Sequence, residues 1–378
     1  MRVQTVSRAQ ILQDLGLRCQ SLAANDNRGF RQEFEELEEV GKDLPARVGD
    51  SGVNREKNRY PYILPYDHCR VRLSVQNGQP HTDYINANFV PGGESERDFI
   101  CTQGPLHNTV ADFWRMVWEQ NVRIVVMVTA LRQKDQVMCD KYWPLDRGTV
   151  HHGLIQVTTV TRKQGPDYFI TTINLRQRAC PTDRIITHYH YPVWPDRGIP
   201  KDVSSLVAFT ELVRQELEAP PRLGPAVVHC SAGVGRSGTF VTALWLMQLC
   251  ARGIPPDIRA AVEDLRLHRM WMVQNLEQYL LVHQCLLHWL RGGGASARRP
   301  QAQGATSNIN PHGSTGRGGH TGRRHNQQQP QQQQQQRRRQ AAPGGRQQNA
   351  VQQILQPGQL LRRLLSSSRR FNPESDAL

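Results

Sequence analysis

Two hydrophobic periodicities alternate along the first 290 residues. Apolar residues recur at every second position, or form short runs, in seven segments, which predicts β-strands. These segments are residues 70–75, 84–90, 98–101, 123–129, 155–161, 168–174 and 184–191. Helical spacing occurs at residues 30–40, 110–120 and 203–218, and it dominates after residue 237. Strands and helices that mix without an internal repeat predict one α/β domain built on a mixed sheet.

The same pattern divides the chain into three parts. Residues 1–27 are weakly patterned and are interpreted as a loosely ordered helical lead-in, whereas residues 28–291 carry the periodic segments of the domain. From residue 292 onward Gly, Gln, Arg and Pro predominate. Such a stretch has too few apolar side chains to bury a core, so residues 292–378 are predicted to be a disordered tail.

Positive charge is concentrated in that tail. The formal net charge of the chain is +14, and from Arg291 onward there are 14 arginines against two acidic residues. Arginine without interleaved aromatic side chains gives salt-sensitive, sequence-independent attraction at best. We therefore expect no more than weak nonspecific contact of the tail with nucleic acid or an acidic membrane, and a solvated linker is the simpler interpretation.

The eight cysteines are scattered, without a C-x-x-C pair. This spacing argues against a disulfide framework and a zinc site, so we expect no metal and a reducing, cytoplasmic setting. The N-terminus does not have the pattern of a signal peptide. The longest apolar run, residues 124–131, is too short to span a membrane. An intracellular portion of a membrane receptor is also compatible with these observations.

The most informative segment is residues 228–237, V-H-C-S-A-G-V-G-R-S. An apolar run precedes it and a helical pattern follows it, which predicts a strand, a loop and a helix. The loop N–H groups and the helix N-terminus would form a site for an anion. A thiol there ionises readily, so Cys230 is the candidate nucleophile, and the guanidinium of Arg236 suits two oxygens of one phosphate. The alternative is an inert buried thiol in a glycine-rich turn.

This segment resembles the Cys-x5-Arg phosphate loop of the tyrosine-specific Cys-based protein phosphatases. Trp194-Pro195-Asp196 is similar to the loop that carries the general acid of that family. Other resembling segments lie within residues 30–290, and they are residues 57–60, 83–88, 102–106, 112–119 and 272–278. Residues 54–73 look most like the single-catalytic-domain receptor-type members. The resemblance implies a single domain with a highly twisted mixed sheet flanked by helices, with the phosphate loop between a strand and a helix.

The resemblance also implies a reaction, the hydrolysis of phosphotyrosine in tyrosine-phosphorylated proteins without a cofactor. Cys230 would attack phosphorus to form a cysteinyl phosphate, and Asp196 would protonate the leaving phenol. Gln274, with Gln278 nearby, would hold the water that hydrolyses the intermediate. Tyr60 would stack on the substrate ring and set the depth of the pocket.

The remaining implied roles belong to the loop and its neighbours. Ser237 would donate to the departing thiolate. His229 would orient the loop and favour the ionised cysteine, and a core histidine with satisfied hydrogen bonds is the alternative. The substrate phosphate would be bound by the loop residues Ser231, Ala232, Gly233, Val234, Gly235 and Arg236.

Four residues depart from the family pattern. Tyr62 replaces an acidic residue or asparagine that contacts the substrate backbone, and Trp271 stands where a small residue widens the adjoining groove. Gln133 and Met138 replace a glutamate and a lysine, of which the glutamate braces the loop arginine. A neutral amide braces a guanidinium less strongly than a carboxylate does. We therefore expect somewhat reduced activity.

Two alternatives to an active tyrosine phosphatase remain. The same departures are compatible with a catalytically weak scaffold that binds phosphotyrosine. A lipid-phosphate or dual-specificity phosphatase is a further possibility, although the ring-stacking loop around Tyr60 argues against the shallow pocket that it would need.

Overall fold

The computed structural model describes residues 5–195, 198–219 and 223–293, and these lie in one unit built around a nine-stranded sheet. The predicted tail falls outside the described residues from residue 294 onward. The strands of the sheet are β1 (Arg70–Arg72), β2 (Tyr84–Val90), β3 (Phe99–Thr102), β4 (Ile124–Met127), β7 (Gly148–His152), β8 (Ile155–Gln164), β9 (Phe169–Gln177), β10 (Arg184–His190) and β11 (Ala226–His229). A separate hairpin pairs β5 (Arg132–Gln133) with β6 (Gln136–Val137).

The sheet is mixed, with parallel strands at its centre. Its order is β1-β2-β3-β11-β4-β10-β9-β8-β7. Strand β11 pairs in parallel with β3 and β4, and β4 pairs in parallel with β10. The outer strands pair antiparallel on both sides. The predicted α/β class with a mixed sheet flanked by helices is therefore confirmed.

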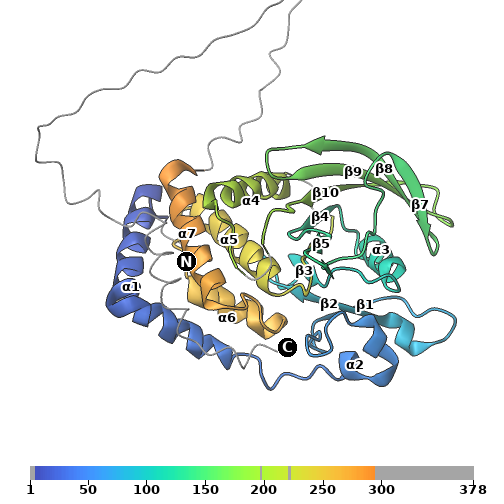
Figure 1. Cartoon of the computed structure of the whole chain (residues 1–378), viewed down its shortest axis with the longest axis horizontal. Coiled ribbons are helices and arrows are strands. Elements are labelled where there is room, and N and C mark those ends of the chain that lie inside the picture. The colour runs from blue at the N-terminus through green and yellow to red at the C-terminus, as the bar shows by residue number, and fades with distance from the viewer. Residues whose placement is uncertain (1–4, 196–197, 220–222, 294–378) are drawn as a thin grey trace, which may run out of the picture. The chain divides into compact units, whose positions relative to one another are not determined.

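Seven α-helices, two 3-10 helices and one π-helix complete the described fold. They are α1 (Arg8–Glu38), α2 (Arg47–Asp50), α3 (Val110–Glu119), α4 (Val203–Glu218), α5 (Gly235–Ala251), α6 (Ile258–His268), α7 (Leu276–His288), η1 (Gly52–Lys57), η2 (Pro80–Asp83) and η3 (Trp289–Gly293). Helices α1, α4, α5, α6 and α7 gather on one side of the sheet, and α3 lies on the other, beside β7 and β8 (Figure 1). The helix α5 follows β11 after a short loop, so it starts near the centre of the sheet.

The N-terminal segment is helical, and from Arg8 onward it is packed more firmly than the loosely ordered lead-in that the sequence predicts. Ile11, Leu15 and Cys19 are buried. The guanidinium of Arg8 lies 4.1 Å from the ring centroid of Trp289, and its Nε donates to the Leu290 carbonyl at 3.0 Å. The weak apolar pattern led to an underestimate of the order of this segment, because one narrow apolar stripe of α1 is enough to pack against α7 and η3.

The helix α1 is interrupted in its middle. Asn25, Asp26 and Asn27 have positive φ values of 53°, 60° and 63°, so the chain leaves the helical conformation and then resumes it. Asn and Asp tolerate the left-handed region better than most residues. Phe30, Phe34 and Leu37 after the interruption are buried, as the predicted helix at residues 30–40 requires.

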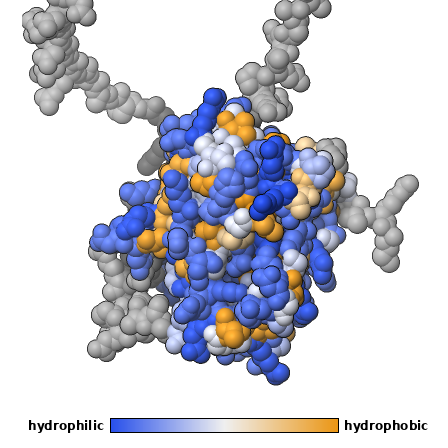
Figure 2. Space-filling model, turned by 90° about the vertical axis from the view of Figure 1, so that its right-hand side faces the viewer, coloured by the Kyte–Doolittle hydropathy of each residue, from blue (hydrophilic) through white to orange (hydrophobic). Residues whose placement is uncertain are grey.

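The face of the unit shown in Figure 2 is mostly polar. In Figure 2 the exposed apolar residues are scattered among hydrophilic ones on the face shown. Among the residues that the structure describes, no helix has the combination of length and hydropathy that a membrane span requires.

Candidate functional site

The candidate site lies where four parallel strands end. The segments that follow β3, β11, β4 and β10 meet at this edge, and they carry Gln103, Cys230, Thr129 and Trp194 respectively. In open α/β sheets, ligands bind outside the carboxyl ends of the strands. The topology therefore brings side chains from distant parts of the sequence to the end of β11.

The loop between β11 and α5 is shaped by Gly233. Its φ is 76°, and a Cβ at this position would lie 2.1 Å from the carbonyl oxygen of Thr102. Only glycine fits such a conformation at such a close approach. The Gly233 N–H points at Cys230 and donates to its sulfur at 3.2 Å. Because α5 begins at Gly235, the N–H groups of its first turn also lie at this loop.

The thiol of Cys230 is buried, with 3% of the residue exposed. Burial by itself raises the pKa of a thiol, but the Arg236 guanidinium, the Ser237 hydroxyl and the N–H groups of Ser237 and Gly233 outweigh it, so the pKa of Cys230 is lowered. The Ser237 Oγ is buried and makes no hydrogen bond of regular geometry within the described residues, so we attribute its effect on the sulfur to proximity. The site thus favours a thiolate.

His229, directly before Cys230, is fully buried and has a partner at each ring nitrogen. Its Nδ1 lies 3.0 Å from the Cys230 carbonyl oxygen, and its Nε2 lies 2.7 Å from the Tyr142 hydroxyl. Burial lowers the pKa of His229 to about 4. The ring is therefore neutral near pH 7, and it can orient the loop but cannot favour the thiolate through a positive charge.

The hydrogen bonds of this neutral ring have a defined direction. A carbonyl only accepts, so Nδ1 of His229 carries the ring proton and its Nε2 accepts from the Tyr142 hydroxyl. The Tyr142 oxygen then accepts from Nε2 of His188, at 2.6 Å. Nδ1 of His188 is left as a buried acceptor that has no hydrogen-bond partner in the described residues. This chain of donors runs from β10 to the Cys230 carbonyl.

Arg236 projects from the first turn of α5 toward the ends of β4 and β10. Its Nη1 donates to Thr129 Oγ1 at 2.9 Å and lies 3.5 Å from the Trp194 carbonyl, and its Nη2 lies 3.3 Å from Gln133 Oε1. The Nε2 of Gln133 donates to the same Trp194 carbonyl at 2.7 Å. The amide of Gln133 thus bridges the arginine and the main chain just before Asp196. A glutamate would lack the donor for the second contact.

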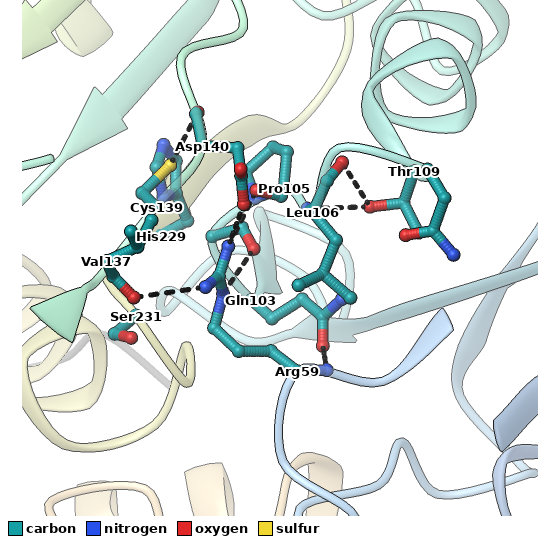
Figure 3. Close-up of polar contacts among 12 residues, drawn as sticks. Arg59, Gln103, Pro105, Leu106, Thr109, Val137, Cys139, Asp140, His229 and Ser231 are labelled. Atoms are coloured by element: carbon teal, nitrogen blue, oxygen red, sulfur yellow. Dashed lines mark hydrogen bonds and ion pairs between the residues drawn. The ribbon is translucent and has the colours of Figure 1, made fainter. Parts of the chain in front are cut away.

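Tyr60 lies beside the loop, with its hydroxyl 2.8 Å from Ser231 Oγ. The preceding residue, Arg59, anchors this segment: its Nη2 lies 2.8 Å from an oxygen of Asp140 and donates to the Pro105 carbonyl at 2.8 Å. Figure 3 shows Arg59 between these partners and the Val137 carbonyl. The segment that carries Tyr60 is therefore fixed to the neighbouring strands and loops.

Gln274 and Gln278 lie against the far end of the loop. The Gln274 N–H donates to Gln278 Oε1 at 2.9 Å. A Cβ at Gly235 would lie 2.9 Å from Gln274 Oε1 and 2.9 Å from the Gln278 amide nitrogen, so both side chains contact the start of α5. Just before them, Trp271 and Val273 have φ values of 60° and 58°. The left-handed conformation costs about 1–2 kcal/mol for each such residue.

Two buried arginines near the end of α6 were missed by the sequence analysis. Arg269 donates through Nε to the Gly233 carbonyl at 2.9 Å and through Nη2 to the Ala232 carbonyl at 3.0 Å. Arg266 donates to the carbonyls of Met272 and Val273. Arg266 lies in the last turn of α6, whereas Arg269 follows the helix in an extended conformation. An isolated sequence does not tell such arginines from solvated ones.

The structure brings most of the predicted site residues to one edge of the sheet. The exception is Asp196, the predicted general acid, which lies outside the described residues. Of the positions that depart from the family pattern, Met138 is buried, whereas 72% of Tyr62 and 44% of Trp271 are exposed. In the ranges that the structure describes, no three His, Cys, Asp or Glu side chains are grouped as metal ligands would be.

Comparison with known proteins identifies the family. The protein-tyrosine phosphatase family model matches residues 54–288. Receptor-type tyrosine-protein phosphatase V of Rattus norvegicus is 43% identical over 271 residues, which cover 72% of this chain and 16% of that protein. Receptor-type tyrosine-protein phosphatase eta of Mus musculus is 41% identical over 268 residues, which cover 71% of this chain and 22% of that protein. The chain thus spans less than a quarter of the length of these relatives.

The reactivity of Cys230 toward iodoacetamide as a function of pH tests the electrostatics of the loop. Since only the thiolate reacts, a lowered pKa preserves reactivity as the pH falls, and we expect a midpoint below about 8.5, the value of a free cysteine. Ser237→Ala should move the midpoint upward. Cys285, whose pKa burial raises to about 12, is an internal control that stays unmodified near pH 7. Modification of the Cys230 peptide is measured by mass spectrometry at each pH. A midpoint at or above 8.5 for Cys230 would contradict this account.

Proposed function

Since the chain belongs to the protein-tyrosine phosphatase family, we propose that it hydrolyses phosphotyrosine in proteins through a cysteinyl-phosphate intermediate. The observation that carries this proposal is the lowered pKa of a buried thiol beside Arg236, at the carboxyl edge of the sheet. A buried thiol without such a surrounding has a raised pKa, as in Cys101 and Cys139. The difference indicates a site built for an anion and a nucleophile.

The first step transfers the phosphoryl group to sulfur. The Cys230 thiolate attacks phosphorus, the bond from phosphorus to the phenolic oxygen breaks, and Asp196 donates a proton to that oxygen. The loop N–H groups and the Arg236 guanidinium bind the equatorial oxygens, and this stabilisation is the largest contribution expected. Thr129 holds Arg236 in position for this contact.

The second step releases phosphate. The Asp196 carboxylate takes a proton from a water molecule held by Gln274, the water oxygen attacks phosphorus, and the sulfur–phosphorus bond breaks. The electron pair returns to Cys230 as thiolate, which the Ser237 hydroxyl and the Gly233 N–H stabilise. The contacts of Gln274 with Gly235 support this role, because they place the amide beside the loop.

Tyr60 would select phosphotyrosine. Its hydroxyl lies 2.8 Å from Ser231 Oγ, so its ring stands at the wall of the loop and Arg59 fixes the segment. A deep pocket keeps the shorter phosphoserine out of reach of the thiolate. We extend the proposal to the organisation of the chain: residues 28–291 are the catalytic domain, residues 292–378 form a tail, and a reducing intracellular setting suits the thiolate.

A second candidate function is a catalytically weak scaffold that binds phosphotyrosine. It is favoured by Gln133, which meets Arg236 through a neutral amide oxygen at 3.3 Å. A longer, uncharged contact restrains the guanidinium less than a carboxylate would. We propose reduced activity on this ground, and an active enzyme remains the better account because the thiol and the loop are intact.

Replacement of the nucleophile tests the reaction. We expect purified protein to release phosphate from a phosphotyrosine peptide, and Cys230→Ser to lower kcat by more than about 10³-fold because no thiolate remains. Cys285→Ser, at a buried position on α7, is the matched control and should keep full turnover. Equal turnover by wild type and Cys230→Ser would rule out the proposal, and tight peptide binding without turnover by wild type would favour the scaffold.

Replacement of the general acid tests the role of Asp196. Asp196→Ala should lower kcat by about 10²–10⁴-fold while substrate binding persists, because the acid acts on the leaving group only. The variant should then retain tyrosine-phosphorylated proteins from a lysate. Adding Arg236→Ala to it should abolish that capture. If Asp196→Ala neither binds nor captures phosphoproteins, the acid has been assigned to the wrong residue.

Gln133→Glu tests the brace behind Arg236. With dinitrophenyl phosphate, whose leaving group needs no acid, we expect a several-fold rise in kcat because the contact becomes charge-assisted. With a phosphotyrosine peptide the gain should be smaller, since the glutamate loses the donor to the Trp194 carbonyl. Gln133→Leu, which removes both contacts, is the control and should be slower on both substrates. Unchanged kinetics of Gln133→Glu would contradict this account.

A further inference from the structure

The turn directly before Gln274 is held in an unfavourable conformation. Trp271 and Val273 both adopt the left-handed region, at φ values of 60° and 58°. Neither a bulky nor a β-branched residue adopts this region without strain. Such strain persists only where the surrounding structure enforces it, and it gathers at functional sites.

The enforcing group on one side of the turn is Arg266 of α6. Its Nε donates to the Met272 carbonyl at 3.0 Å, and its Nη2 donates to the Val273 carbonyl at 2.7 Å. Its Nη1 donates to the Leu37 carbonyl at the end of α1, at 2.7 Å. The side chain is almost fully buried, with 2% of the residue exposed. Three donors on a rigid planar group thus fix two successive carbonyls of the turn relative to α1.

The other side of the turn lies against the loop and α5. The Val273 N–H donates to the Val234 carbonyl at 3.2 Å. A Cβ at Gly238 would lie 2.4 Å from the Val273 nitrogen, so the glycine permits this close approach. The peptide units of the turn are therefore clamped between Arg266 and the start of α5. The clamp ends one residue before Gln274.

We propose that Arg266 is a positioning residue for the second step of the reaction, because it holds the strained turn Trp271–Val273 that places Gln274 beside Gly235. This inference rests on the proposed function, in which Gln274 holds the hydrolytic water. Arg266 acts through the main chain and does not touch the reacting atoms.

The contacts of Arg266 separate its role from that of Arg269. Arg269 donates to the Gly233 and Ala232 carbonyls of the loop itself, so its loss would disturb both steps. Arg266 donates to carbonyls of the turn and of α1. Its loss should therefore affect the hydrolysis of the cysteinyl phosphate more than its formation.

The experiment measures the two steps separately in Arg266→Lys. Lysine keeps the positive charge, but its ammonium group replaces the planar guanidinium and its several fixed N–H donors. The carbonyls of Met272 and Val273 are then no longer held by one rigid group. With p-nitrophenyl phosphate in stopped flow, we expect a burst of nitrophenol whose rate changes less than about twofold, followed by a steady state slowed about tenfold, as small misplacements of reacting groups produce. Arg214→Lys, the same change at a buried arginine of α4 that pairs with Glu211, is the matched control and should leave the ratio of the two rates unchanged.

Two further variants distinguish positioning from general damage. In a Trp271→Gly background the effect of Arg266→Lys should shrink, because glycine adopts the left-handed conformation without strain. Gly238→Ala pushes on the Val273 nitrogen from the opposite side, and it should slow the second step while Arg266 is intact. This variant also provides the test if Arg266→Lys does not fold.

The outcomes separate this inference from the proposed function. The role of Arg266 would be overturned by equal slowing of both steps in Arg266→Lys. It would also be overturned if Gly238→Ala left the ratio of the burst rate to the steady-state rate unchanged. In either case the proposed function would still be supported by turnover of the wild-type protein. Absence of turnover in wild type would instead remove the proposed function on which the inference depends.

Discussion

The cost of placing a negative charge on a buried sulfur is the constraint on which this site depends. Removing an ion from water costs several kcal/mol unless fixed dipoles and charges replace the solvent. At Cys230 those replacements are the Gly233 N–H, the first turn of α5 and the Arg236 guanidinium. Gly233 lies against Thr102 at the end of β3, and Thr129 after β4 binds Arg236. The sheet and α5 must therefore both be in place before the thiolate is favourable.

Buried guanidinium groups form the framework behind the loop. Arg266 and Arg269 are almost fully buried, and their hydrogen bonds go to main-chain carbonyls and to the amide oxygens of Asn86 and Asn88. Carbonyl acceptors satisfy the donors without neutralising the charge, so burial lowers the pKa of Arg269. The same positive charge lies behind a loop that must bind an anion. A framework of arginines therefore serves the electrostatics of the site as well as its shape.

Local patterns were sufficient for the central strands and for the loop. Parallel strands buried on both faces produce the continuous apolar runs that identified β4 and β11. The strand β7 and the β5–β6 hairpin were missed because they are short, polar and largely exposed. The loop was found because its chemistry lies within ten consecutive residues. The contacts of Arg269 and Thr129 form only when segments that are distant in the sequence meet in the fold. Residue spacing in the sequence therefore does not predict their roles.

The hydrogen-bond chain from His188 through Tyr142 to His229 does not change its protonation state near neutral pH. Burial keeps the pKa of His229 at about 4 and that of His188 well below its ordinary value, so neither ring gains a proton near neutrality. Burial likewise holds the Tyr142 hydroxyl in its protonated form. A pH profile of the protein above about pH 5 therefore carries no signal from this chain, and its inflections belong to groups that face the substrate.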